Sequence, residues 1–147
     1  MARQSAAYRT TGAGSATLPM ASLYASSTGG LWLVEVGVTN TTVTAFECSL
    51  KRVTTAGTQG TAQTAVYEEN DGNFTAKGDP RDTHTVAPTL VAGEIRRTSI
   101  GASIGSGAIW CFGGRGLFIP SGTANGVALM PMTGTGQICD VYWSWDA

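Results

Sequence analysis

Hydrophobic and polar residues alternate strictly near the end of the chain. Cys139, Val141, Trp143 and Trp145 fall on one face of residues 139–146, and mainly polar residues occupy the other face. Because successive side chains of a strand point to opposite faces, this period of two predicts a β-strand with one buried face. Side chains of this size are typical of the core of a β-sandwich.

Similar segments recur along the chain. Residues 31–39 alternate strongly, and Val34, Val36 and Val38 are expected on one face. Further segments with strand character are residues 16–24, 46–51, 83–87, 94–100, 108–112, 117–119 and 126–132. Turns rich in glycine and threonine separate them. The short connection at residues 40–42 predicts a hairpin between the segments on either side of it.

This pattern predicts the fold class. About eight short strands separated by turn signals, without a helical period, are typical of β-sandwiches and jelly rolls. The 20 glycines and the 13% of charged residues agree with a turn-rich β-protein. We therefore predict an all-β, single-domain antiparallel β-sandwich of jelly-roll type, formed by residues 16–147.

The first residues lack the alternation. Residues 1–15 are small, polar and interrupted by glycines, which predicts a flexible N-terminal arm outside the sandwich domain. Arg3, Tyr8 and Arg9 in this arm are of the types that anchor protein–protein contacts. On this interpretation, deleting residues 2–14 leaves the fold nearly intact and weakens attachment to a partner.

Charge and hydropathy argue against several function classes. A net charge of −1 leaves no basic surplus for phosphate neutralisation, so we expect no nucleic-acid partner. No stretch approaches the about 18 apolar residues of a membrane span, so we expect no membrane partner. The first residues contain no apolar segment of signal-peptide length, which predicts synthesis in the cytoplasm.

Residues that carry chemistry are sparse. His84 is the only histidine, and we expect it to point outward from a strand. The alternative is a site in which Asp82 or a neighbour orients His84, and His84 activates Cys111 or a serine. Cys48, Cys111 and Cys139 lie in apolar segments and are predicted to be buried free thiols; a disulfide between two of them is the alternative. No cysteine–histidine spacing fits a zinc site. We therefore predict that the protein is not an enzyme and needs no cofactor.

Two further features leave alternatives open. Residues 67–82 are the most polar part of the chain and predict a surface loop, whose carboxylates could bind Ca²⁺ or form a glycosidase pair, although neither spacing is matched. The four tryptophans could stack against carbohydrate. However, the apolar neighbours of Trp143 and Trp145 favour the core or a subunit interface, and we group Trp110 with them.

Two long segments, residues 31–63 and 100–146, share a distinctive order of turns and strands. A strand ends in VTNTT, the next runs into KRVTTAGT, and IPSGTANG precedes a terminal aromatic strand. This order resembles small jelly-roll capsid decoration, or head-associated, proteins of tailed bacteriophages. The resemblance implies a cement protein made in the bacterial host cytoplasm. It would bind the phage major capsid protein on the outside of the capsid, commonly as a homotrimer, and stabilise the lattice by mass action.

Two rival functions remain. The first is a trimeric fibre-tip or receptor-binding module, in which residues 67–82 and exposed aromatic side chains touch a glycan. Binding to cells or glycans rather than to capsids would distinguish it. The second is a small β-fold enzyme that depends on His84, and its test is the loss of a measurable activity in His84→Ala.

Overall fold

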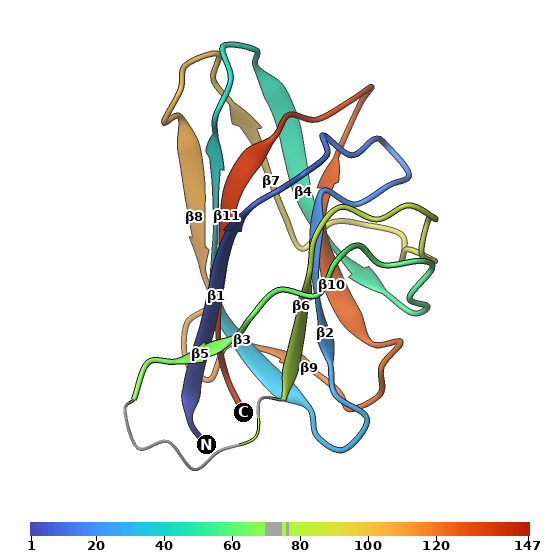
Figure 1. Cartoon of the computed structure of the whole chain (residues 1–147), viewed down its shortest axis with the longest axis vertical. Helices are drawn as coiled ribbons and strands as arrows, with labels where there is room; N and C mark the ends of the chain where they lie inside the picture. The colour runs from blue at the N-terminus through green and yellow to red at the C-terminus, as the bar shows by residue number, and fades with distance from the viewer. Residues whose placement is uncertain (70–74, 76) are drawn as a thin grey trace.

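The protein is a sandwich of two β-sheets (Figure 1). The computed structural model describes residues 1–69, 75 and 77–147. The strands are β1 (Arg3–Arg9), β2 (Ala21–Ala25), β3 (Leu31–Asn40), β4 (Phe46–Val53), β5 (Val66–Tyr67), β6 (Gly78–Arg81), β7 (Arg96–Ile100), β8 (Gly107–Cys111), β9 (Leu117–Ile119), β10 (Gly126–Pro131) and β11 (Cys139–Asp146). One sheet has the order β5-β1-β11-β3-β8, with β9 also paired to β3, and the other has the order β6-β2-β10-β4-β7. The predicted all-β sandwich is confirmed.

The strand pairing is that of a jelly roll. Eight strands pair from the outside inward along the chain: β1 with β11, β2 with β10, β3 with β8, and β4 with β7. This is the pairing of one long hairpin folded over on itself, with its strands divided between two sheets. The short strands β5 and β6 extend the sheets beside β1 and β2, and β9 continues along β3 beyond β8.

The core lies between the two sheets. Trp143 and Trp145 of β11 are fully buried there, as their alternation predicts. Leu23 of β2 and Leu50 of β4 belong to the same cluster and come from the opposite sheet. Trp110 on β8 is half-buried and packs against this cluster at the sheet edge. Trp143 and Trp145 are therefore core aromatic residues, and Trp110 borders the core.

The predicted flexible N-terminal arm is wrong. β1 pairs with β11 over its whole length, from Arg3 opposite Asp146 to Arg9 opposite Asp140. The segment has a weak hydrophobic signal because two of its inward-facing residues, Gln4 and Ala6, are polar or small, although both are buried; the third is Tyr8. Its ladder partner, β11, supplies the hydrogen bonds and the large side chains. The first strand is therefore part of the domain that was assigned to residues 16–147.

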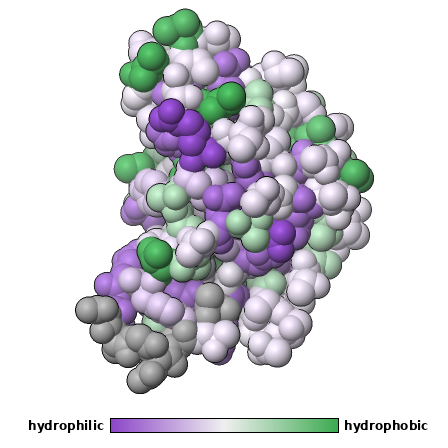
Figure 2. Space-filling view, viewed as in Figure 1, coloured by the Kyte–Doolittle hydropathy of each residue, from purple (hydrophilic) through white to green (hydrophobic). Residues whose placement is uncertain are grey.

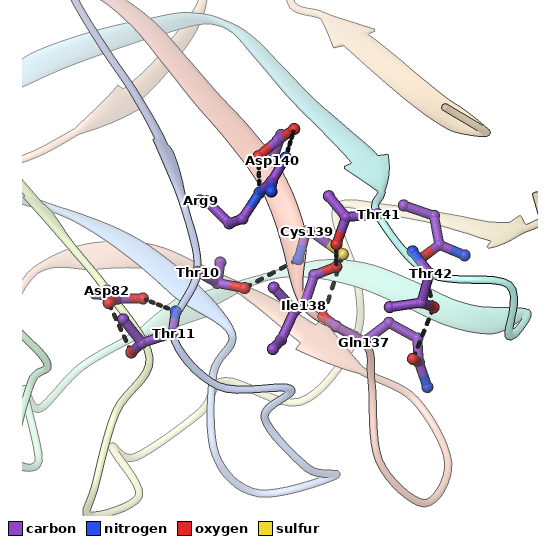
Figure 3. Close-up of polar contacts among 11 residues, drawn as sticks. Arg9, Thr10, Thr11, Thr41, Thr42, Asp82, Gln137, Ile138, Cys139 and Asp140 are labelled. Atoms are coloured by element: carbon purple, nitrogen blue, oxygen red, sulfur yellow. Dashed lines mark hydrogen bonds and ion pairs between the residues drawn. The ribbon is translucent and has the colours of Figure 1, made fainter. Parts of the chain in front are cut away.

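Further contacts fix the chain just after β1 (Figure 3). The hydroxyl oxygen of Thr10 accepts a hydrogen bond from the backbone N–H of Cys139 at 3.0 Å. The backbone N–H and the hydroxyl of Thr11 donate to the two carboxylate oxygens of Asp82 at 3.0 and 2.8 Å. Asp82 is itself buried. These contacts anchor residues that the sequence assigned to a loose segment.

Other local predictions are also corrected. The hairpin across residues 40–42 is absent, because β3 and β4 lie in different sheets. Residues 83–87 form no strand, and only Val86 makes an isolated bridge, to Thr58. By contrast, β6 lies inside the polar region that was expected to be a surface loop, and it pairs with β2.

A β-bulge interrupts the predicted alternation of β3. Along β11, Ser144 lies opposite Glu35 and Trp145 lies opposite Leu33, so Val34 has no residue opposite it. Leu33 is buried, whereas Val34 is half-buried. The single extra residue of a bulge changes which face the following side chains occupy. Val34 therefore does not share the buried face expected for it.

Candidate functional site

The single histidine lies in a buried contact with a serine. Ser22 Oγ and His84 Nε2 are 2.7 Å apart, and both residues are buried, so the outward orientation expected for His84 is wrong. Burial also lowers the pKa of His84. The carboxylate of Asp82 contacts Thr11 instead of orienting the histidine. A serine nucleophile needs access to its substrate, and this pair has none, so it contributes to packing.

The three cysteines are free thiols. Cys48 and Cys139 are buried as predicted, and burial raises the pKa of Cys139 to about 12. Cys111 is exposed, which corrects the prediction for that residue. Its thiol donates a hydrogen bond to a carboxylate oxygen of Glu35 at 3.1 Å, and this contact raises the pKa of Cys111. A thiol held in the protonated form is a poor nucleophile.

Metal ligands do not converge in the described part of the chain. Within those residues, no group of three His, Cys, Asp or Glu side chains could hold a metal ion. Asp71, which belonged to the calcium hypothesis, lies outside the described residues. Glu68 accepts a hydrogen bond from the hydroxyl of Ser144 at 2.9 Å, and Asp79 pairs with Arg81 at 2.8 Å.

The outer face of the β5-β1-β11-β3-β8 sheet carries a shallow depression, which we call the outer groove. It consists of three adjoining hollows of about 510, 360 and 310 Å³. The first two share Arg3 and Glu68, and the last two share Ala7 and Tyr142. The hollows follow the seam between β1 and β11, so the groove is elongated along the strands.

Small side chains form the floor of the outer groove. Ser5 lies opposite Ser144, and Ala7 lies opposite Tyr142, on the paired strands β1 and β11. Because these serine and alanine side chains are short, the surface is hollow between the larger groups around them. The weak hydrophobic signal of β1, which suggested an arm, thus reflects residues that shape this surface.

Tyr142 and Glu35 form one wall. The Tyr142 ring covers Gly37 on β3, where an added Cβ would lie 2.0 Å from the ring carbon Cε1. Only glycine therefore lets the ring pack this closely on β3, and the half-buried Tyr142 side chain lines two of the hollows. The Tyr142 hydroxyl donates to the Glu35 carboxylate. This bond and the one from Cys111 lower the pKa of Glu35, while burial raises that of Tyr142.

Two ion pairs border the outer groove at its ends. Arg9 makes two bonds to Asp140, at 2.8 and 2.9 Å, which lower the pKa of that carboxyl (Figure 3). Arg3 likewise contacts both oxygens of Asp146, one of them at 3.1 Å. The predicted anchors Arg3 and Arg9 are therefore outward-facing strand residues, each with a carboxylate partner.

Tyr8, the third predicted anchor, faces inward. Its hydroxyl donates to the backbone oxygen of Arg81 at 2.7 Å and accepts from the Trp143 indole N–H at 3.1 Å. Burial raises its pKa. Both hydrogen-bonding roles of the hydroxyl are used within the protein, so Tyr8 links the N-terminal strand to the core instead of anchoring a partner.

A second aromatic group lies beyond Glu35 along β3. Trp32 packs against Phe118 of β9, with ring centroids 4.7 Å apart, and the Arg115 guanidinium lies 6.0 Å from the Trp32 ring. Phe118 is exposed. Of the four tryptophans considered as a carbohydrate platform, Trp32 is thus the one that faces away from the core beside an exposed aromatic ring.

One end of the sandwich presents apolar loop tips, which we call the apolar end. Val43 in the β3–β4 connection is 73% exposed, and Ile104 in the β7–β8 connection is 72% exposed. Figure 1 places both connections at the top of the view, and Figure 2 shows hydrophobic surface at the same end. Ile138, which precedes β11, adds a third exposed apolar side chain near them.

Buried Asn40 holds these connections together. Its side-chain amide donates to the backbone oxygens of Thr44 at 2.8 Å and Gly101 at 3.0 Å, one in each connection. Thr42 donates its hydroxyl to Gln137 Oε1 at 2.8 Å, which ties in the segment before β11 (Figure 3). The apolar side chains therefore project from loops that are cross-linked by hydrogen bonds.

No protein-family model, curated protein or solved structure matches this chain. The described residues include no helix that is long and apolar enough to cross a membrane.

Among the described residues, the outer groove and the apolar end are the two surfaces that we consider as candidate functional sites. The alternation in the sequence placed both Tyr142 and Glu35 on the polar faces of their strands, but it did not predict their contact. Val43 and Ile104 were not predicted as surface features.

Proposed function

We propose that this protein is a structural, non-catalytic component of a bacteriophage particle. It binds the major capsid protein on the outside of the capsid and stabilises the lattice as a decoration, or cement, protein. It is made in the cytoplasm of the bacterial host and joins the virion there. The resemblance of its strand and turn order to head-associated proteins supports this proposal, as does a jelly-roll fold, which recurs in viral structural proteins.

The observation that carries the proposal is the apolar end. Large apolar side chains that are exposed together mark surfaces for contact with other proteins. Val43 and Ile104 are held in position by the Asn40 network, so little conformational entropy is lost when they bind. The N-terminal residues, which belong to a paired strand, have no special part in this contact.

The test is co-sedimentation with capsids of the phage that encodes the chain, after removal of the resident copies of this protein. The double variant Val43→Ser/Ile104→Ser should bind at least about tenfold more weakly, because truncated anchor residues each cost more than about 1 kcal/mol. The control Val86→Ser/Val91→Ser changes two exposed valines in another connection and should bind within about twofold of wild type. Wild-type binding by Val43→Ser/Ile104→Ser would contradict the proposal.

We further propose that the protein acts as a homotrimer. Symmetric assembly suits a protein that binds at positions of local symmetry on a capsid. Light scattering after size-exclusion chromatography should give a mass about three times the 15.1 kDa of one chain. A monomer both in solution and on the capsid would contradict this part of the proposal.

The fibre-tip or receptor-binding module remains the rival function. The outer groove favours it, because that surface is polar and elongated and contains an aromatic wall. Binding to host cells without binding to capsids would favour this rival over a decoration protein.

A further inference from the structure

The outer groove has the length of an extended ligand. Its hollows run from Arg3 to Arg9 along β1, a span of about 20 Å at the usual rise of a strand. The hollows are shallow and continuous, so a compact cofactor would leave most of the groove empty. A chain of several linked units would occupy all of it.

The groove cannot bind a peptide by strand addition. Its floor is the seam between β1 and β11, and β11 also pairs with β3 on its other side. Strand addition requires unpaired backbone groups at a sheet edge, and both strands of the floor are paired with each other across the seam. The outer edge of β1, which pairs with β5 only at Gln4 and Ser5, flanks the groove and does not form its floor. Recognition in the outer groove must therefore come from side chains.

The side chains along the groove suit a ligand with many hydroxyl groups. Glu35 and Glu68 present carboxylate oxygens that can accept hydrogen bonds beyond those from Tyr142, Cys111 and Ser144. The Ser144 hydroxyl, which donates to Glu68, can accept a bond from a ligand, and the Ser5 hydroxyl can both donate and accept. Tyr142 adds an aromatic ring that packs on Gly37 and lines the groove, which suits the apolar face of a sugar ring. Few groups other than sugars combine an apolar face with a rim of hydroxyls.

The charges of the groove argue against an anionic ligand. Its lining includes two arginines and five carboxylates, which are Arg3, Arg9, Glu35, Glu68, Glu69, Asp140 and Asp146. Both arginines are already paired with carboxylates across the β1–β11 seam. A phosphate, sulfate or sialic acid group would meet an excess of negative charge. The lining therefore favours an uncharged ligand.

We propose that the outer groove is a binding site for a neutral oligosaccharide. Its sugar units lie along the β1–β11 seam, one of them stacks on Tyr142, and their hydroxyls bond to Glu35 and Glu68. The site is separate from the apolar end, so this inference goes beyond capsid binding and does not depend on it. A particle whose coat protein carries such a site can hold to glycans at the surface of its host.

The experiment uses the full-length protein on an array of linear hexose and N-acetylhexosamine oligomers and neutral bacterial O-polysaccharides, together with sialylated and sulfated glycans. Ala7→Trp places a large ring in the exposed floor of the groove without entering the core. Ser99→Trp is the matched control, since Ser99 is an exposed strand residue of the opposite sheet. Glu35→Gln and Tyr142→Leu test the wall directly.

We expect wild type and Ser99→Trp to bind at least one neutral glycan with affinities within about twofold of each other. Ala7→Trp, with an unchanged circular dichroism spectrum, should bind that glycan at least about tenfold more weakly, and Glu35→Gln and Tyr142→Leu should also weaken binding. Because the ligand is neutral, raising NaCl from about 0.1 to 0.5 M should change the affinity by less than about twofold.

Three results would overturn the proposal. The first is the absence of binding to every neutral glycan on the array. The second is equal binding by wild type and by the wall variants Glu35→Gln and Tyr142→Leu, which keeps the test decisive even if Ala7→Trp does not fold. The third is binding only to charged ligands that is lost in high salt, which would show that the groove is an electrostatic site.

Discussion

The outer groove and the apolar end are built in opposite ways. In the groove, side chains project from paired strands, and its polar groups contact each other, as Tyr142 does with Glu35 and Arg9 with Asp140. At the apolar end, the exposed side chains of Val43 and Ile104 project from loops and carry no polar groups. The difference teaches that one small domain can keep a polar recognition surface and an apolar contact surface apart. Changes that disrupt the pairing of β1 with β11 should damage the groove and the fold together. Changes at the loop tips should affect only the contact with the capsid.

Deleting residues 2–9 should have the largest effect. These residues contain all of β1, which pairs with β11 and carries Ser5 and Ala7 of the groove floor. Without them the edge of β11 and the buried tryptophans are exposed, so we expect loss of the cooperative thermal transition seen by circular dichroism. A truncated protein with an unchanged Tm would show instead that the segment is an arm.

Trp143→Ala should be next in size. Trp143 is fully buried in the core beneath the groove, and its indole N–H bonds to Tyr8. Removing a buried tryptophan side chain costs about 3–5 kcal/mol, measured as the free energy of unfolding in urea. The comparison variant is Val43→Ala at the apolar end, for which we expect a change within about 0.5 kcal/mol. Similar losses in the two variants would contradict the distinction between the surfaces.

Asn40→Ala tests what holds the apolar end together. The change removes the amide donors from the backbone oxygens of Thr44 and Gly101, and we expect a loss of about 1–3 kcal/mol. Capsid binding should also weaken, because the two loops are no longer fixed to each other. Asn125→Ala is the control, since Asn125 bonds to Ser121 in an exposed turn away from both surfaces. If Asn40→Ala is as stable as this control, the network is not structural.

The smallest expected effect is a dependence of stability on pH that arises from His84. Burial lowers its pKa in the folded protein, so below its ordinary value of about 6.5 the unfolded chain binds a proton that the folded chain does not. Stability should therefore fall as the pH decreases from 7.5 to about 5.5, a range above the ordinary pKa of Asp and Glu. The urea midpoint of His84→Gln should fall less over the same interval, and equal slopes would contradict this cause.

The predictability of the fold differs between its first and last strands. In β11, large apolar residues such as Trp143 alternate with polar ones, so the strand and its buried face were predicted from the sequence. β1 makes the same ladder with small residues such as Ala6 and with a buried polar residue, Gln4, which carry no such pattern. Its conformation is set by its partner, which lies at the far end of the chain. Pairing at such long separation has no local signature.

The candidate surfaces were predictable only in part. The alternation of β11 put Tyr142 on the outer face, but the close packing of its ring depends on Gly37 of the neighbouring strand. The loops that carry Val43 and Ile104 lie at one end because jelly-roll pairing brings them there, and Asn40 joins them by bonds to Thr44 and Gly101. Each of these features depends on which strands are neighbours, and the order of the strands was not predicted from the sequence.

The most direct test of the account is one co-sedimentation experiment with capsids and three proteins: wild type, Ala7→Trp and Val43→Ser/Ile104→Ser. If the two surfaces act separately, Ala7→Trp sediments with capsids as wild type does, and the loop variant stays in the supernatant. Loss of capsid binding in Ala7→Trp, with full binding by Val43→Ser/Ile104→Ser, would contradict the account and place the capsid contact in the groove.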